Sequence, residues 1–271
     1  MMRENDCVWP QWNVSPRVRA FVTTRAGGVS DAPYGGAPGA GGLNLGFSSG
    51  DAPEAVTENR RRALALTGSR NAAWLEQIHG TQVEDAHTII ERLARGERTR
   101  ADASATDRAG VVCVVMTADC LPVLLCDDEG RAVGAAHAGW RGLAGGIVEK
   151  TGERVANLAG VPSSKLNAFL GPAIGPQAFE VGEDVLDAFV AAARAQRRDA
   201  TAAAFAPLGG TPAKYLADIY ALARLRLADL GIDDSRIHGG TLCTVIEKER
   251  FYSYRRDRVT GRMAAMIWLN D

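Results

Sequence analysis

The first pair of residues able to do chemistry is Cys120 with His137, at the two ends of a predicted β-hairpin. Asp127-Asp128-Glu129-Gly130 is a cluster of turn residues between two apolar runs, a pattern typical of a hairpin. Pairing symmetric about this turn sets Cys120 directly opposite His137 and Cys126 opposite Arg131. Opposed residues have Cβ atoms about 4.5–5.5 Å apart and share one face of the sheet. A thiolate and an imidazole at that separation can bind one metal ion.

Pro122 leaves a second register open, because proline cannot donate to the ladder and is found at bulges. A shift by one residue would turn Cys120 and His137 to opposite faces. A free cysteine in an apolar run is also commonly a small core residue. Cys120 differs from that pattern because it stands where the run breaks, and Gly139 after His137 gives room for close approach.

His79 is a third candidate, at the end of a predicted strand and followed by Gly80. By itself, a histidine in this setting is more often a structural hydrogen-bonding group. His87 and His238 are assigned structural roles as well, although two glycines follow His238.

The elements that must position these residues are read from apolar periodicity and from capping and turn residues. Strands are predicted at residues 18–24, 74–78, 111–116, 121–126, 131–137, 166–170, 237–243 and 263–269, with a further one near Gln82. Helices are predicted between residues 51 and 68 and at 141–158, 183–195 and 212–230. Residues 27–50 are expected to form a long surface loop that borders a site, and residues 194–207 an exposed, mobile connection. No repeat or linker divides the chain, so one mixed α+β domain over residues 1–271 is expected.

Composition excludes several classes of protein. The 271 residues are 46% apolar and 23% charged, as in an ordinary globular protein. The formal net charge of −1 gives no long-range attraction to nucleic acid or to an anionic membrane, so neither is an expected partner. The sequence has no recognisable secretory signal and no apolar run of membrane-spanning length. Five cysteines are too sparse for a disulfide scaffold, so reduced thiols and a cytoplasmic location are expected.

Longer motifs along nearly the whole chain carry a resemblance to a known family. They are Thr24-Arg25-Ala26-Gly27-Gly28-Val29-Ser30, Asn44-Leu45-Gly46, Gln77-Ile78-His79-Gly80, Thr117-Ala118-Asp119-Cys120-Leu121-Pro122-Val123-Leu124-Leu125, Ala136-His137-Ala138-Gly139-Trp140-Arg141-Gly142, Gly171-Pro172-Ala173-Ile174-Gly175-Pro176, and Tyr254-Arg255-Arg256-Asp257 with Gly261-Arg262. In this order they resemble the bacterial purine nucleoside phosphorylases once called multicopper polyphenol oxidases or laccase-domain proteins. Some members of that family are named peptidoglycan editing factors.

The resemblance implies a fold of two packed mixed β-sheets with helices on the outer faces, in four α/β/β/α layers. It also implies that His79, Cys120 and His137 are the catalytic zinc ligands. The implied reactions are phosphorolysis of adenosine, inosine and methylthioadenosine, with phosphate as the second substrate, and hydrolytic deamination of adenosine. Residues 35–42, which are rich in glycine and alanine, depart from the family pattern as a local insertion.

Three ligands of the His2Cys type leave a fourth position on zinc open, as in catalytic rather than structural sites. Water bound there has a pKa of roughly 7, and Cu2+ can use the same donors. A multicopper oxidase needs imidazoles for several ions, whereas the whole chain has four histidines. A polyphenol oxidase is therefore not expected.

The substrate ligands are predicted from their neighbourhood in the motifs. Arg141, at the start of a predicted helix, is a candidate phosphate ligand because helix N-termini attract anions. Arg25, beside Gly27 and Gly28, is the second phosphate candidate. Two amides are candidate ligands of ribose or base, and two carboxylates are candidates for proton transfer or ligand orientation: Asn44, Gln77, Asp102 and Asp119.

Two other functional classes stay open. A metal-free hydrolase, such as an amidase that edits a peptidoglycan precursor, would use Cys120 as nucleophile and His137 as base. Such a dyad has no use for His79, whereas the metal site needs both histidines. A non-catalytic binding protein stabilised by its metal would unfold without zinc and have no turnover to lose. The oligomeric state does not follow from the sequence.

Overall fold

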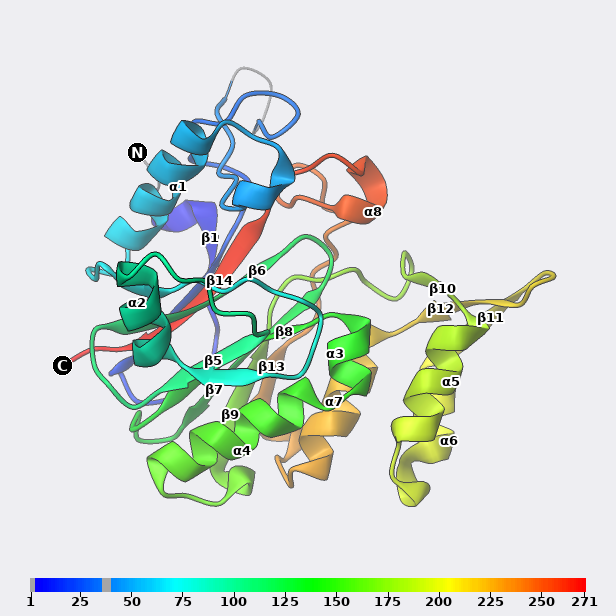
Figure 1. The fold of residues 1–271 in the computed structure, drawn as a ribbon. Helices are drawn as coiled ribbons and strands as arrows, with labels where there is room; N and C mark the ends of the chain where they lie inside the picture. Colours follow the sequence, from blue (N-terminus) through cyan, green and yellow to red (C-terminus); the bar gives the residue numbers. More distant parts are fainter. Residues whose placement is uncertain (1–2, 36–39) are drawn as a thin grey trace.

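Two β-sheets packed face to face form the centre of the computed structural model, which describes residues 3–35 and 40–271 (Figure 1). The first sheet has five strands, in the order β1 (Cys7–Val8), β2 (Val18–Thr23), β14 (Met263–Leu269), β6 (Val111–Thr117) and β3 (Asn71–Ala73). The second has six, in the order β13 (Ile237–Gly239), β9 (Leu166–Leu170), β7 (Leu121–Asp127), β8 (Val133–Ala138), β5 (Ala103–Thr106) and β4 (Val83–Asp85). Both sheets combine parallel and antiparallel neighbours, so the expected pair of mixed sheets is confirmed.

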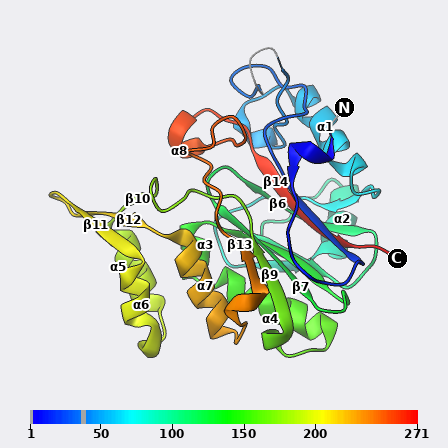
Figure 2. The ribbon, with the colours of Figure 1, turned by 180° about the vertical axis from the view of Figure 1, so that it is seen from behind.

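Helices cover the outer face of each sheet (Figures 1 and 2). On the five-stranded sheet, α1 (Pro53–Ala65) packs Ala63 against the outer side chains of β6 and β14. The six-stranded sheet is covered by α3 (Trp140–Ala144), α4 (Ile147–Ala159) and α7 (Ile219–Asp229). At one edge, α2 (Ala86–Ala94) inserts Ile89 into the core between the sheets. The α/β/β/α order of layers agrees with the expected α+β fold.

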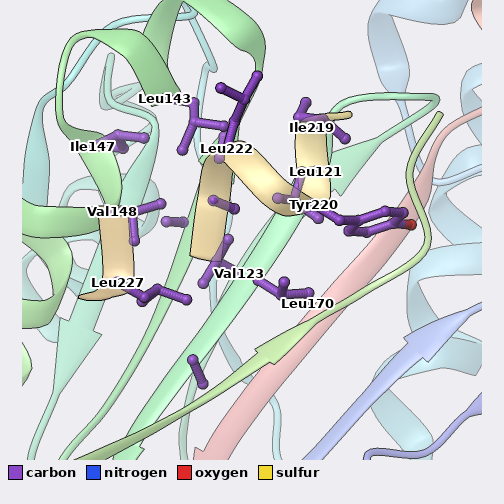
Figure 3. Close-up of a cluster of buried hydrophobic side chains, with 14 of the residues drawn as sticks. Leu121, Val123, Leu143, Ile147, Val148, Leu170, Ile219, Tyr220, Leu222 and Leu227 are labelled. Carbon is purple, nitrogen blue, oxygen red and sulfur yellow. The ribbon is translucent and has the colours of Figure 1, made fainter. Parts of the chain in front are cut away.

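Strand β7 is buried on both faces, as its nearly continuous apolar run predicts. Leu121 and Val123 point toward the helices and meet side chains of α3, α4 and α7 (Figure 3). Leu124 and Cys126 point the other way, into the core between the sheets. Burying such a side chain contributes roughly 1.5–3 kcal/mol to folding, so β7 is anchored from both sides.

The predicted hairpin forms, but its symmetric register is wrong. His137 lies opposite Pro122, and Cys126 lies opposite Val133 rather than Arg131. The pairing is displaced by two residues from the prediction, and a displacement by two keeps every side chain on its predicted face. Cys120 is therefore a diagonal neighbour of His137 on the same face. No bulge interrupts the ladder at Pro122.

The displaced register has its cause in the side chain of Asp127. Its carboxylate accepts hydrogen bonds from the backbone N–H groups of Glu129, Arg131 and Ala132, at 3.1, 2.7 and 3.0 Å. These bonds occupy residues 131 and 132 in the turn, so β8 begins at Val133.

A third, three-stranded sheet extends from the body of the molecule (Figure 2). It consists of β10 (Glu180–Gly182), β12 (Lys214–Ala217) and β11 (Phe205–Gly209), and α5 (Glu183–Ala192) and α6 (Arg198–Ala203) lie beside it. The segment 194–207, predicted as an exposed, mobile connection, contains α6 and the start of β11. The helix predicted over 212–230 is wrong in its first part, because residues 214–217 pair with both neighbouring strands. Asp218 then caps α7 by accepting from the N–H groups of Tyr220 and Ala221.

Three further predictions are wrong. Residues 74–78 form a loop rather than a strand, since Asp102 takes the N–H groups of Ile78 and His79. The helix predicted over 141–158 is two helices, α3 and α4, separated at Gly146, whose φ is 91°. The strand predicted over 237–243 ends at Gly239.

Other predicted elements are confirmed. Strands β9 and β14 have the predicted bounds, and β2 and α1 lie within theirs. Of the insertion predicted at residues 35–42, residues 36–39 lie outside the described residues. Over the described ranges, no helix combines the length and the apolar character needed to cross a membrane.

The hydroxyl group of Tyr220 provides a test of how the sheet and its loops are joined (Figure 3). It accepts a hydrogen bond from the N–H of Ala173 at 2.8 Å and donates one to the carbonyl of Leu242 at 2.6 Å. Because Tyr220→Phe leaves both buried groups unpaired, we expect the free energy of unfolding to fall by about 1–3 kcal/mol. Tyr215→Phe is the control, since that hydroxyl makes no hydrogen bond within the described residues. Urea unfolding of both variants measures the difference, and equal effects would contradict this role.

Candidate metal site

His79, Cys120 and His137 come together at one end of the two sheets. His79 lies in the loop after β3, Cys120 directly precedes β7, and His137 lies near the end of β8. One ligand atom from each residue lies within 4.8 Å of the other two. Cys120 Sγ is 3.8 Å from His79 Nε2, and the two imidazole rings are 4.8 Å apart between centroids. Within residues 3–35 and 40–271, no other three His, Cys, Asp or Glu side chains converge in this way.

The three donors fit a metal ion. Zinc bonds of about 2.0 Å to nitrogen and 2.3 Å to sulfur place tetrahedral ligand atoms roughly 3.3–3.6 Å apart. The observed 3.8 Å between Cys120 and His79 needs only a small closing movement. His137 is buried, Cys120 partly buried and His79 exposed, so one side of the cluster faces solvent. A site of this kind can bind an ion and still admit a substrate.

Asp102 holds two of the three ligands in place. Its carboxylate accepts hydrogen bonds from the N–H groups of His79 and Gly80, at 2.9 and 2.7 Å. It also lies 2.9 Å from Nδ1 of His137, and its backbone carbonyl accepts from the His137 N–H at 2.7 Å. Pairing at Nδ1 leaves Nε2 as the metal-binding nitrogen of His137. Burial raises the pKa of Asp102, but the bonds from His137, Gly80 and His79 outweigh burial and hold this pKa below its usual range.

The backbone is strained next to two of the ligands. His79 has a φ of 58°, and Asp119, immediately before Cys120, has a φ of 91°. Residues other than glycine adopt such conformations at a cost of about 1–3 kcal/mol, which the surrounding structure must offset. Around Asp119, the Thr244 hydroxyl donates to Oδ1 and the Arg255 N–H donates to Oδ2, both at 2.6 Å. These contacts hold the backbone just before Cys120 and so orient the Cys120 side chain.

Gly139 gives the cluster its space. A β-carbon built at residue 139 would lie 2.9 Å from Cδ2 of His79 and 3.2 Å from Sγ of Cys120. The backbone angles of Gly139 suit any residue, so the glycine is required by space and not by φ. The expectation that residue 139 permits close approach is confirmed.

The charges in the cluster favour a thiolate at Cys120. Burial raises the pKa of this thiol, but His137 and then His79 outweigh burial and lower the pKa to about 6. In return, Cys120 and Asp102 raise the pKa of His137 above its usual value despite burial. Other cysteines differ, since burial raises the pKa of Cys7 and of Cys113 to about 12. The thiolate is the form that binds metal.

Alkylation tests this charge state directly. In metal-free protein, we expect iodoacetamide to modify Cys120 before the four buried cysteines. The rate should stay high as the pH falls to about 6 and drop below it, because the thiolate is lost only there. Added zinc should protect Cys120. Peptide mass spectrometry identifies the modified residue, and a rate that already falls between pH 9 and 8 would contradict the lowered pKa.

Asp102→Asn tests whether this carboxylate positions the ligands. An amide offers one acceptor oxygen in place of two and turns an NH2 group toward the N–H donors. We expect zinc affinity to fall about 10- to 100-fold, the usual effect of losing such a partner. The control is Asp85→Ala, which removes the cap of α2 at about 0.5–2 kcal/mol and should leave zinc affinity unchanged. Competition with a chromogenic chelator measures the affinity, and equal values for Asp102→Asn and the wild type would exclude the role.

The predicted amide ligands bond to the backbone. Gln77 donates from Nε2 to the Met116 carbonyl at 2.8 Å and accepts from the Met116 N–H at 2.7 Å. Asn44 is fully buried and accepts from the N–H groups of Gly46 and Arg262, at 3.0 and 2.8 Å. Both amides therefore position the walls of the site.

The two predicted phosphate ligands have different surroundings. Arg25 donates to the carbonyls of Gly35 and Lys248 and lies 5.0 Å from the Tyr252 ring centroid. Arg141 is exposed, in the short helix α3, and its guanidinium stacks 4.2 Å from the Trp140 ring centroid. His87 pairs with Glu91, outside the cluster.

Arg262 is a site residue that the sequence reasoning did not select. Arg262 is partly buried. The negative charges of the Cys120 thiolate and of Asp119 favour its charged form. The available signal was its place in the Gly261-Arg262 motif near the end of the chain.

Comparisons with known proteins identify the family to which this chain is similar. Residues 19–270 match a family model described as multi-copper polyphenol oxidoreductase laccase. A Pseudomonas aeruginosa protein named purine nucleoside phosphorylase PA4543 is 48% identical over 267 residues, which cover 98% of this chain and 100% of the relative. An Escherichia coli protein named purine nucleoside phosphorylase YfiH is 50% identical over 262 residues, covering 96% of this chain and 97% of the relative.

Solved structures share the fold. The Neisseria meningitidis protein NMB0706 has a TM-score of 0.86 and 46% identity, with 98% of this chain and 100% of that chain covered. YlmD from Geobacillus stearothermophilus has a TM-score of 0.83 and 28% identity. The match covers 100% of this chain and 98% of that chain.

Proposed function

Since this chain belongs to the family described as multi-copper polyphenol oxidoreductase laccase, and its relatives bear the name purine nucleoside phosphorylase, we propose that it is a purine nucleoside phosphorylase. The proposed substrates are adenosine, inosine and methylthioadenosine, each with inorganic phosphate. Deamination of adenosine is a proposed second reaction of the same site. The observation that carries the proposal is the convergence of His79, Cys120 and His137 in one cluster, one side of which is open to solvent.

The proposed metal is zinc, held by His79, Cys120 and His137. When bound with an open fourth position, zinc supplies Lewis-acid chemistry to a substrate oxygen or water. The protein's part is to keep the donors ready: Asp102 directs Nε2 of His137 toward the ion, and Cys120 is a thiolate at neutral pH. Cu2+ binds such donors at least as strongly as zinc, so weak oxidase activity with copper is compatible with this site.

Roles for the remaining candidates stay predictions. Their contacts support positioning roles for Asn44, Gln77 and Asp119, which hold the backbone around the ligands. The exposed guanidinium of Arg141 is free to meet a substrate, whereas that of Arg25 already bonds two carbonyls. The cytoplasmic location also stays a prediction.

A cysteine-dependent hydrolase is the second candidate, favoured by the lowered pKa of Cys120 beside His137. Such an enzyme, acting on an amide of a peptidoglycan precursor, would use the same thiolate as nucleophile. A polyphenol oxidase with several coppers fits less well, because the described residues offer donors for one ion.

Metal content and turnover distinguish these functions. For the phosphorylase, we expect about one zinc per chain, as for a single three-ligand site, and release of adenine from adenosine only when phosphate is present. Because His79→Ala removes a metal ligand, it should lower zinc content and reduce the rate at least about 100-fold, whereas a Cys–His dyad would keep its activity. The control is His87→Ala, which changes a histidine on α2 and should retain both properties. Metal analysis and chromatography of the bases measure the result.

Two outcomes would contradict the phosphorylase. One is amide hydrolysis by metal-free protein that survives in His79→Ala, which would establish the hydrolase. The other is conversion of adenosine to inosine with no phosphate-dependent base release, which would leave a deaminase alone.

A further inference from the structure

Arg262 is distant from the proposed metal ligands in the sequence, but the fold brings it to the end of the sheets where Cys120 lies. Its N–H donates to Oδ1 of Asn44 at 2.8 Å, and its carbonyl accepts from the N–H of Leu45 at 3.0 Å. The next residue, Met263, pairs with Thr117 in the five-stranded sheet. Since Cys120 follows Thr117 after a turn of two residues, Arg262 and Cys120 leave the sheets at the same end.

The side chain of Arg262 has a defined course. A β-carbon built at Gly46 would lie 2.7 Å from Cγ of Arg262, so the side chain runs directly over that glycine. Its guanidinium carbon then lies 5.8 Å from the ring centroid of Tyr254. Nη1 donates to the carbonyls of Thr260 and Gly261, at 3.0 and 3.1 Å. Local backbone and an aromatic ring thus fix one end of the guanidinium.

The other end of the guanidinium has no acceptor. Within the described residues, Nε and Nη2 make no hydrogen bond, and no carboxylate forms an ion pair with Arg262. A partly buried cation without a counter-ion is costly, because burial removes water that no anion replaces. Burial accordingly lowers the pKa of Arg262, and the Cys120 thiolate and Asp119 act against burial. Arginine stays charged even so, and its positive charge interacts with the negative charge of the Cys120 thiolate.

Two other arginines, Arg60 and Arg25, are already engaged. Arg60 lies between the rings of Phe47 and Trp74, with its guanidinium carbon 4.5 and 3.8 Å from the two centroids. Its Nε donates to the carbonyl of Leu45 at 2.9 Å. Arg25 bonds two carbonyls, as described above. Of Arg25, Arg60 and Arg262, only Arg262 keeps both Nε and Nη2 without an acceptor within the described residues.

We propose that Arg262 binds the phosphate substrate next to Cys120, through a two-point ion pair from Nε and Nη2. The inference rests on the proposed phosphorylase and names the residue that recognises its anionic substrate. A planar guanidinium matches two phosphate oxygens, and the charge-assisted pair supplies the counter-charge that Arg262 lacks. Arg141, in its exposed position, can add at most a solvent-screened charge.

Three variants test the proposal. Arg262→Gln keeps the Cγ that covers Gly46 and removes the charge, and Arg262→Lys keeps the charge and removes the two-point geometry. The matched control is Arg258→Gln, because the Arg258 guanidinium carbon also lies 5.8 Å from the Tyr254 ring while the residue itself is exposed. Zinc content and thermal unfolding confirm that each variant is intact.

For Arg262→Gln we expect the KM for phosphate to rise about 30-fold or more, as when one partner of a desolvated charge pair is removed. The KM for the nucleoside should change less than about threefold, since a uniform loss of binding would raise both constants. Arg262→Lys should fall between Gln and wild type, and Arg258→Gln should match the wild type. An unchanged phosphate KM in Arg262→Gln, or equal rises in both constants, would overturn the proposal.

Calorimetric titration with inorganic phosphate gives a readout independent of turnover. Wild type and Arg258→Gln should bind phosphate, and Arg262→Gln should not. If the wild type shows no phosphate-dependent base release, the proposed function fails while this titration still decides whether Arg262 forms an anion site. Equal binding by wild type and Arg262→Gln would exclude Arg262 whatever the reaction.

Discussion

The Asp102 carboxylate joins parts of the chain that are far apart in the sequence. It accepts from the N–H groups of the His79 loop, pairs with the ring of His137, and its own carbonyl continues the ladder to β8. A carboxylate buried at 0% exposure is unfavourable unless donors surround it, and here the donors are the site itself. If Asp102 lost its charge, its hydrogen bonds to the His79 loop and to Nδ1 of His137 would weaken. The placement of both histidines therefore depends on this one group.

A second set of contacts orients Cys120, as Asp102 orients His79 and His137. The strained Asp119 is held by Thr244 and by the N–H of Arg255, while its carbonyl accepts from the N–H of Ile174. Three separate loops therefore meet at the residue before the thiolate. The histidines depend on β5, and the cysteine depends on the loops after β9 and β13.

Sequence reasoning succeeded where local patterns decide the structure. The apolar runs of β9 and β14 are bounded by residues that end strands, and both were predicted with their full bounds. Cys120 and His137 were placed on one face although their register was wrong by two, since side-chain direction depends only on whether a displacement is odd or even. Where a single side chain redirects the backbone, patterns do not suffice: Asp127 sets the start of β8, and Asp102 converts an expected strand into the His79 loop. For the same reason, local patterns did not place His79 at the site, and only the family resemblance assigned it there.

The order of strands in the five-stranded sheet has a consequence for how the protein is made. Strand β14 lies between β2 and β6 and supplies all the hydrogen bonds that join them. During synthesis, β2 and β6 leave the ribosome long before residues 263–269. Until β14 is made, each of these strands has one edge without a hydrogen-bonded neighbour. Exposed edges of apolar strands are prone to pair with other chains, so the tendency to aggregate is greatest during this interval. Arg262 is made just before β14, so it is synthesised long after His79, Cys120 and His137.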